Sequence, residues 1–411
     1  MSPKDFSGTG ASPLRRALGR PGFRRLLAAA TVSRWGDTFS AVALVVLVYR
    51  LTGSGLKVGV AVAFEVVPVL LLGFVAGAVV DRLPRRQVMI AADVGRAAIA
   101  LALAAFGSHL GVVYAAAFGL SALTVFFNPA STSTVPALVP PEDLVGANAA
   151  LWSGAVLSQI VLAPVAGGLV AWAGTGPAFV VNAASFAVSA LLLAGLRVPA
   201  RDEGSSPQRR ARAWSDVAEG LRVVRDSPLL RVLAGVQALA ALSAGATSAL
   251  LVVLAERHLD AGPGRFGLLL GAIGVGAGLG PLVLQRLVPD VRRPSLLFGP
   301  YLLRGVVDLI LAAVSWFPAA LAALAGYGVG TSTGMVTWNT VLQSSVDDRR
   351  RGRVFAFFDV IWQASRLASI AGGGALADAV GIRAVYVAGG LLLLAAGGLG
   401  LARRRAVVEP V

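Results

Sequence analysis

Three acidic side chains stand inside long apolar stretches of the sequence, at Asp37, Glu65 and Asp359. An ionisable group near the middle of a lipid bilayer costs about 2.5–3.5 kcal/mol on insertion scales, so it requires a cavity, a partner or a function. A carboxylate held at that depth can take up and release a proton during a working cycle. We therefore predict these three residues as candidates for proton coupling.

Two of these carboxylates could instead form permanent salt bridges with nearby arginines and exchange no proton. Arg34 precedes Asp37 by one helical turn on the same face, so Arg34 is expected to hold Asp37 ionised. A permanent pair with Arg34 or Arg96 would leave Asp37 or Glu65 with a structural role only. Because of Arg34, we favour Glu65 over Asp37 as the proton site.

Aromatic and amide side chains in the same stretches could bind an apolar, partly polar molecule. Near the end of the sequence, Asp359, Gln363 and Arg366 follow one another along a single helical stripe. For each tryptophan, helix packing or an interfacial belt is the alternative. The candidate substrate contacts are Arg34, Trp35, Gln159, Trp338, Asn339, Trp362, Gln363 and Arg366.

The elements that hold these residues are predicted to be membrane-spanning helices. Of the 411 residues, 56% are hydrophobic and 14% are charged, whereas a soluble domain carries about 25% charged residues. A spanning helix needs roughly 20 apolar residues. The sequence predicts twelve such helices, near 25–50, 57–81, 87–107, 110–128, 147–173, 176–196, 229–255, 265–285, 294–315, 317–343, 354–380 and 384–402.

The basic residues predict how these helices are oriented. Most of the 36 Lys and Arg residues fall in segments that alternate with loops carrying few basic residues, and the basic segments of a membrane protein stay in the cytoplasm. This pattern places both termini in the cytoplasm. The long polar segment 197–228 is predicted to be a cytoplasmic linker with a short amphipathic helix at 214–225.

The two halves of the chain resemble each other. Segment 139–149 is similar to segment 346–356, about half the chain length later, and Arg96 has Arg304 in the matching place. The expected fold is therefore an all-α membrane protein with twelve transmembrane helices in two pseudo-symmetric six-helix bundles. In such a parallel repeat the substrate path runs between the halves. The predicted units are an N-terminal bundle at 1–196, the linker at 197–228 and a C-terminal bundle at 229–411.

A charged loop follows the second predicted helix. Asp81 stands at the C-terminal end of that helix, where the helix dipole disfavours an anion, so another partner is expected. The eleventh helix begins near Val354 and offers free N–H groups. We predict that Asp81 docks there, or pairs with Arg85, when the cytoplasmic side closes. A loop that only satisfies the positive-inside pattern is the alternative.

The same loop resembles a family motif. Residues 77–86, GAVVDRLPRR, are similar to the signature loop of the major facilitator superfamily, G-x-x-x-D-R-x-G-R-R, with Pro84 in place of the usual glycine. Segments 126–149 and 351–359 resemble the branch of this superfamily that contains enterobactin and macrolide exporters. The motif residues, expected to form a gate, are Gly77, Asp81, Arg82, Arg85 and Arg86.

A second motif lies in the fifth predicted helix. Pro164, Gly167 and Gly168 resemble the antiporter motif G-P-x-x-G-G, with Ala163 in place of its first glycine. The family resemblance implies the major facilitator fold, in which helices 1, 2, 4, 5, 7, 8, 10 and 11 line a central cavity. It places the charged residues of helices 1, 2 and 11 at that cavity. Two further pairs on supporting helices are expected to be structural salt bridges, Asp93 with Arg96 and Arg304 with Asp308.

Other classes of function are disfavoured. The basic residues are dispersed between apolar runs, which is not the pattern of a nucleic-acid-binding protein. With no cysteine and two histidines, the chain offers no thiolate or histidine-built metal centre. Segment 330–334 fits G-x-S-x-G, but it lies in an apolar helix without a preceding strand, and no P-loop is present. We expect neither an enzyme nor a cofactor.

The expected function is secondary active transport in a bacterial cytoplasmic membrane. The substrate is expected to be a small amphipathic compound, such as a drug, a macrolide-like antibiotic or a siderophore-like metabolite, exported in exchange for protons. Antibiotic resistance is a predicted consequence. A monomer in the lipid bilayer is expected. The alternatives are an importer or uniporter, and a non-transporting sensor or scaffold, against which the polar stripes of helices 1, 2 and 11 argue.

Overall fold

The computed structural model describes residues 12–198, 213–287 and 293–403, and within these ranges the regular secondary structure is entirely helical. Twelve of the helices in the described ranges are long and apolar enough to cross a membrane, as predicted. The first six are α2 (Pro21–Thr52), α3 (Gly55–Arg82), α4 (Arg85–Phe106), α5 (Leu110–Leu138), α6 (Leu144–Ala173) and α7 (Thr175–Ala194). The second six are α9 (Pro228–Ala249), α11 (Pro263–Leu287), α12 (Pro294–Ala313), α13 (Phe317–Ser344), α14 (Asp348–Ala379) and α15 (Ile382–Ala402).

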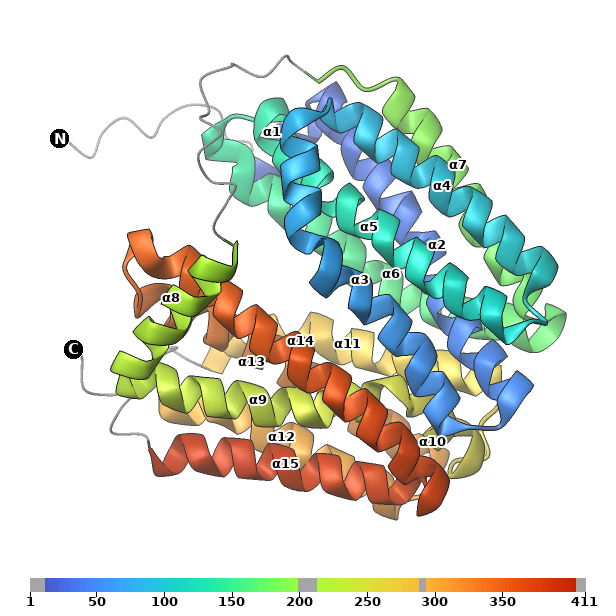
Figure 1. The fold of residues 1–411 in the computed structure, drawn as a ribbon, viewed down its shortest axis with the longest axis vertical. Coiled ribbons are helices and arrows are strands. Elements are labelled where there is room, and N and C mark those ends of the chain that lie inside the picture. The colour runs from blue at the N-terminus through green and yellow to red at the C-terminus, as the bar shows by residue number, and fades with distance from the viewer. Residues whose placement is uncertain (1–11, 199–212, 288–292, 404–411) are drawn as a thin grey trace.

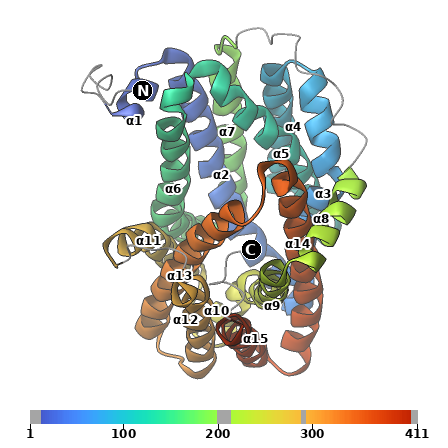
Figure 2. The same ribbon diagram turned by 90° about the vertical axis from the view of Figure 1, so that its left-hand side faces the viewer.

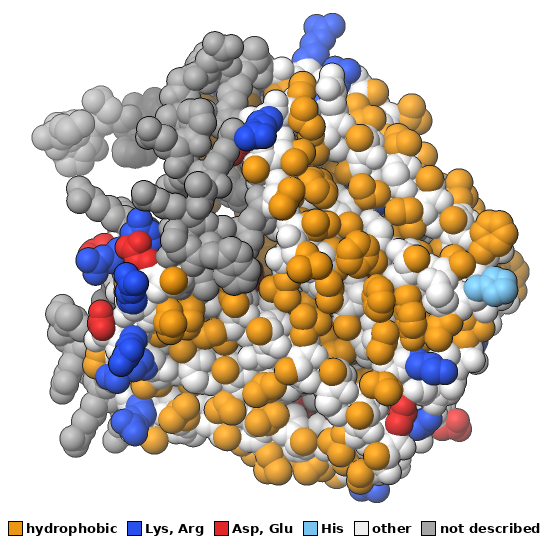
Figure 3. Space-filling model, viewed as in Figure 1, with side chains coloured by type: hydrophobic (Ala, Val, Ile, Leu, Met, Phe, Trp, Pro, Cys, Tyr) orange, Lys and Arg blue, Asp and Glu red, His pale blue; other side chains and the backbone are white. Residues whose placement is uncertain are grey.

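The twelve helices form two bundles. Helices α2–α7, the first half, gather on one side of the molecule, and α9–α15, the second half, gather on the other (Figures 1 and 2). We call the end where α2 begins the proximal end and the end where α2 finishes the distal end. Apolar side chains cover the middle of the face seen in Figure 3, and most charged side chains on that face gather toward the two ends.

Prolines and glycines set several helix boundaries. Pro21, Pro228 and Pro294 each occupy the start of a helix, where the missing N–H has no partner to lose. Gly174 and Gly381 adopt positive φ angles of 82° and 103° between the fifth and sixth helix of each half. A left-handed turn at the same place in both halves agrees with the repeat that the sequence suggests.

Four short helices accompany the spans: α1 (Pro13–Leu18), η1 (Pro141–Asp143), α8 (Ala213–Asp226) and α10 (Leu251–Arg257). The amphipathic helix predicted at 214–225 is confirmed as α8. The run predicted as one helix at 229–255 is divided, because the backbone leaves the α-helical region at Leu250 (φ −99°, ψ 13°). Hydropathy does not report such a break, since the sequence is apolar on both sides of it.

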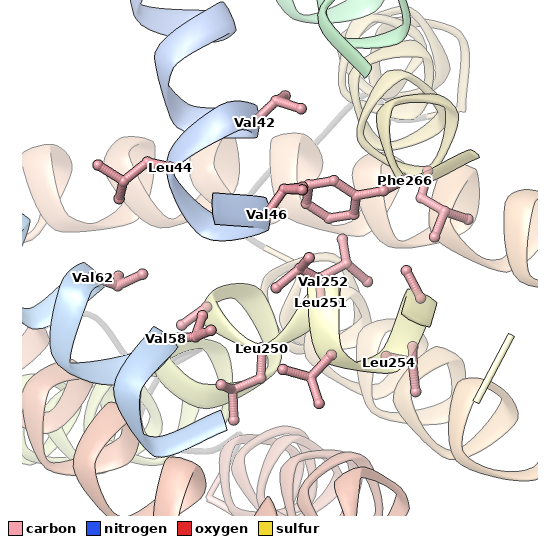
Figure 4. Packing of buried hydrophobic residues seen from close by; sticks show 14 of the residues in the cluster. Val42, Leu44, Val46, Val58, Val62, Leu250, Leu251, Val252, Leu254 and Phe266 are labelled. Carbon is pink, nitrogen blue, oxygen red and sulfur yellow. The ribbon is translucent and has the colours of Figure 1, made fainter. Parts of the chain in front are cut away.

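The buried apolar residues show where the halves meet. At the distal end one cluster joins both halves, with Val46 and Val58 of the first half packed near Leu251 and Phe266 of the second (Figure 4). At the proximal end the described residues form two separate clusters. One contains Phe23 and Met89 of the first half, and the other contains residues of the second half only. Within the described ranges, the halves therefore share a buried apolar cluster at the distal end alone.

Candidate functional site

Six charged side chains lie near the middle of four helices and interact with one another. We call this group the central charge cluster. Helix α2 contributes two members, α4 two, and α3 and α14 one each. The members are Arg34, Asp37, Glu65, Asp93, Arg96 and Arg366.

Asp37 is partly exposed to solvent and also lies close to a buried residue inside the first half. Its side chain is 44% exposed, and its Oδ2 lies 4.0 Å from Nη1 of Arg96. Arg34, one turn earlier, interacts with Asp37 electrostatically, but the two form no salt bridge in the described structure. The sequence predicted Arg34 as the partner of Asp37, whereas in the structure Arg96 is the residue that lies at salt-bridge distance from Asp37.

Arg96 is held on several sides inside the first half. Its side chain is 1% exposed, and its guanidinium donates to the buried carboxylate of Asp93. The guanidinium lies 4.5 Å from the ring centre of Phe127 and 4.3 Å from that of Phe186, a favourable placement for a cation. The predicted Asp93–Arg96 salt bridge is confirmed, and Arg96 also lies 4.0 Å from Asp37, a pair that the sequence offered as an alternative.

Glu65 carries the electrostatic interaction between the halves. It is half-buried in α3 and interacts with Arg366 of α14 and with Asp37 of α2. The hydroxyl of Ser121 in α5 donates to the backbone carbonyl of Glu65. Glu65 therefore lies where its charge acts on both halves, and α5 holds its backbone.

The matching buried pair of the second half is arranged differently. Arg304 donates to the hydroxyl of Tyr327 at 2.8 Å, and Asp308 accepts from Ser243 at 3.4 Å. In the described residues Arg304 and Asp308 interact electrostatically but bond to other partners and form no salt bridge, so the prediction of a direct pair was wrong. Arg304 instead directs its Nη2 donor to the hydroxyl of Tyr327 in α13.

The other predicted contact residues differ in accessibility. Trp35 and Gln159 are exposed, and so is Asp359, the third residue predicted as a candidate for proton coupling. Trp338 is 8% exposed and packs edge-on against Phe358, so in this structure it belongs to the apolar core of the second half. The half-buried residues among the predicted contacts are Asn339, Trp362, Gln363 and Arg366.

A carboxylate of the second half caps a helix of the first half at the distal end. Asp378, near the end of α14, accepts from the backbone N–H of Gly55 at 2.7 Å and of Leu56 at 3.1 Å. It also accepts from the hydroxyl of Ser54 at 2.5 Å. These groups begin α3, and their free N–H donors favour an anion. We call this contact the distal latch.

A basic residue joins the halves beside the distal latch. Arg257, the last residue of α10, donates to the hydroxyl of Tyr49 at 2.8 Å and to the carbonyl of Gly53. Both acceptors belong to the end of α2 and the turn that follows it. Since α10 exists only because the chain bends at Leu250, that bend places Arg257 between the halves.

One glycine of the predicted antiporter motif, Gly167, lies in the contact between α6 and α11. A Cβ on Gly167 would come within 2.5 Å of the Pro263 carbonyl, and a Cβ on Gly267 within 2.4 Å of the Ala163 carbonyl. Such distances allow only glycine without movement of the backbone. Gly168 has nothing within 4 Å of a Cβ, so the two motif glycines have different surroundings.

The charged loop of the first half lies at the proximal end. Asp81 and Arg82 finish α3 and are exposed. Arg85 begins α4 and donates to the carbonyl of Ser133 in α5 at 2.6 Å, and Arg86 donates to the carbonyl of Leu196 at 3.3 Å. Arg85 and Arg86 therefore bind the loop to the first half through hydrogen bonds.

Sequence reasoning missed the distal contacts. Asp378 stands close to the C-terminal end of its helix, where an anion is disfavoured, which is the same signal that singled out Asp81. Arg257 stands in one of the loops that carry few basic residues, and nothing else in the sequence distinguishes it. Its partner Tyr49 gives no signal in the sequence, because the contact depends on how α10 folds back.

Comparisons with known proteins agree on one class. Residues 9–409 match the family described as transmembrane secretion effector. The chain is 27% identical over 401 residues to the uncharacterized MFS-type transporter YfiS of Bacillus subtilis, covering 92% of this chain and 91% of the relative. It is 28% identical over 389 residues to the multidrug efflux pump Tap of Mycobacterium tuberculosis, covering 91% and 90%.

Solved structures share the fold at low sequence identity. The nucleoside transporter NupG is 12% identical, with a TM-score of 0.75 over 93% of this chain and 98% of that one. A bacterial homologue of the iron transporter ferroportin is 14% identical, with a TM-score of 0.71 over 94% and 98%.

Proposed function

Because the chain belongs to the transmembrane secretion effector family of the major facilitator superfamily, we propose that it exports small amphipathic molecules from the bacterial cytoplasm in exchange for protons. The similarity to multidrug efflux pumps supports a substrate such as a drug, a macrolide-like antibiotic or a siderophore-like metabolite. The protein works as a monomer in the membrane.

In this proposal the proximal end faces the cytoplasm. The basic residues Arg82, Arg85 and Arg86 lie there, and basic loops stay on the cytoplasmic side. Both termini then lie in the cytoplasm. The distal latch, with Asp378 and Arg257, faces the outside.

The separation of the apolar clusters is the observation that carries the proposal. The halves share one buried cluster at the distal end and have separate clusters at the proximal end. A transporter that alternates between two openings has this arrangement when its path opens toward the cytoplasm. Export requires the opposite state, in which the distal latch and the contact between α6 and α11 open.

The central charge cluster supplies the coupling. Asp37 is exposed at mid-span, where contact with lipid would be costly, so it faces a hydrated path between the halves. Asp37 and Glu65 interact and act as one coupled site that binds a proton. Protonation removes a negative charge that attracts Arg366 in the opposite half, and this weakens the attraction between the halves.

The driving force is sufficient for this mechanism. One charge moving through 100 mV supplies about 2.3 kcal/mol. A tenfold concentration difference costs about 1.4 kcal/mol. One proton per cycle therefore sustains more than a tenfold gradient of a neutral substrate.

Everted membrane vesicles provide the test. We expect everted vesicles containing the protein to accumulate a fluorescent cationic dye or a macrolide when the lumen is more acidic than the medium, because protons then leave as the substrate enters. The substrate should be lost when a protonophore collapses that gradient. Equal accumulation with and without the gradient would contradict coupling. Accumulation only in right-side-out vesicles would indicate an importer.

A further inference from the structure

We propose that Arg96 is a positioning residue for proton exchange, and that its partner Asp93 controls how strongly Arg96 acts on Asp37. The inference rests on the proposed function, since it concerns the pH at which the coupled pair Asp37 and Glu65 exchanges its proton. Neither Arg96 nor Asp93 contacts substrate in this account.

The geometry places one cation between two carboxylates. Arg96 donates from Nη2 to Asp93, while its Nη1 lies 4.0 Å from Oδ2 of Asp37 and 3.4 Å from Oγ1 of Thr124. Asp93 is completely buried, whereas Asp37 reaches solvent. The guanidinium of Arg96 therefore lies between Asp37, which protons from the path can reach, and Asp93, which they cannot reach.

The surroundings keep the guanidinium in place. Phe127 and Phe186 hold it from α5 and α7 at 4.5 and 4.3 Å. Nε of Arg96 makes no hydrogen bond to a described residue, and the hydroxyl of Ser189 in α7 interacts with the carboxylate of Asp93. Arg96 therefore keeps one unused donor, and its guanidinium can shift between the two carboxylates while it stays between the two aromatic rings.

The backbone of α2 is held close to this network. A Cβ on Gly36 would lie 1.9 Å from Oγ of Ser185 and 2.4 Å from Oδ1 of Asn182, both in α7. Glycine at this position lets α2 approach α7, and the next residue is Asp37. The distance between Asp37 and Arg96 is therefore set by helix packing, and a movement of α2 changes it.

The charges around Asp37 come from four helices. Arg34 lies on its own helix, Arg96 and Asp93 on α4, and Glu65 on α3. Arg366 of α14 acts on Glu65. An opposite charge within about 4–6 Å favours the ionised carboxylate, so Arg96 makes the Asp37–Glu65 pair release its proton more readily.

Two substitutions of the buried pair should act in opposite directions. Asp93→Asn removes the competing carboxylate, so Arg96 acts more strongly on Asp37, and transport should need a lower pH. Arg96→Lys keeps a positive charge beside Asp93, but its shorter head group does not span to Asp37, so transport should reach half its maximum at a higher pH. Each shift should be about one pH unit, the lower limit for a charge at this distance.

The measurement is the pH dependence of proton-driven ethidium transport in proteoliposomes. The controls are Asp308→Asn and Arg304→Lys, which change the matching buried pair of the second half, where no salt bridge to a path-facing carboxylate is present in the described residues. These controls should lower stability to a similar degree and leave the pH at half-maximal transport unchanged. Thermal unfolding of each variant separates a loss of folded protein from a shift in pH.

The outcomes distinguish the inference from the proposed function. Opposite shifts for Asp93→Asn and Arg96→Lys support the inference, and if only one variant folds, the direction of its shift decides. Shifts in the same direction, no shift, or equal shifts in the second-half controls would overturn it while leaving proton coupling intact. If the native protein transports ethidium at the same rate with and without a proton gradient, both the inference and the proposed proton coupling are wrong.

Discussion

The carboxylate of Asp378 accepts a hydrogen bond of 2.7 Å from the backbone N–H of Gly55, which begins α3. Asp378 belongs to the second half and Gly55 to the first, and the two helices run in opposite directions. Each of the two helices carries an aspartate near its C-terminal end, Asp378 in α14 and Asp81 in α3. The helix pair is therefore equipped for a carboxylate contact at either end.

Asp378→Asn should weaken the distal latch. The amide lacks the negative charge that the start of α3 favours, a difference of roughly 0.3–1 kcal/mol for an exposed site. The population that is open at the distal end should rise about twofold to fivefold. Because the chain has no cysteine, spin labels at Leu51→Cys and Val380→Cys can report the distal distance without background. Asp260→Asn, at the same end, should leave the distance distribution as it is.

Gly267→Ala should impair transport by separating α6 from α11. Its Cβ would meet the Ala163 carbonyl at 2.4 Å, and overpacking of this kind costs about 1–3 kcal/mol. We expect a lower transport rate and a lower thermal midpoint. The matched control is Gly168→Ala, whose Cβ meets nothing within 4 Å. Normal transport by Gly267→Ala would show that this contact is not part of the moving interface.

Asp81→Asn should slow transport without preventing membrane insertion. In the proposed cycle Asp81 docks at the start of α14 when the cytoplasmic side closes, and the amide loses the charge that this site favours. Arg85→Ala should act in the same direction but more weakly, since Arg82 and Arg86 remain. Initial rates at matched expression test both. Native rates for Asp81→Asn would rule out a gating role for this loop.

His258 should affect stability in acid and leave coupling unchanged. The pKa of His258 lies below its usual value, mainly because the side chain is partly buried and also because the positive charge of Arg383 is nearby. Because the unfolded chain binds the proton more readily, the stability gained from neutral His258 is present at neutral pH and falls as the pH drops below about 6.5. Thermal unfolding between pH 7 and 5 should therefore decline less steeply for His258→Gln. An unchanged slope for His258→Gln would contradict this role of His258.

The sequence predicted the twelve spans and the linker helix because apolar length and amphipathic periodicity are local properties. It also found Asp37, Glu65 and Arg366 from the cost of placing charge in lipid. The bend at Leu250 could not be seen, since the apolar run continues through it. The approach of Arg96 to Asp37 depends on Gly36 packing against α7, and Trp338 is buried by Phe358, which lies on another helix. The unit boundaries at 196 and 229 and the functional roles of the site residues remain predictions.

Substrate-induced proton release by the purified protein in detergent tests the central claim most directly. Binding of ethidium to the native protein should release protons from the Asp37–Glu65 pair. The double variant Asp37→Asn with Glu65→Gln should bind ethidium and release none, while Glu142→Gln, an exposed carboxylate at the proximal end, should release as much as the native protein. Undiminished proton release from the double variant would contradict the account.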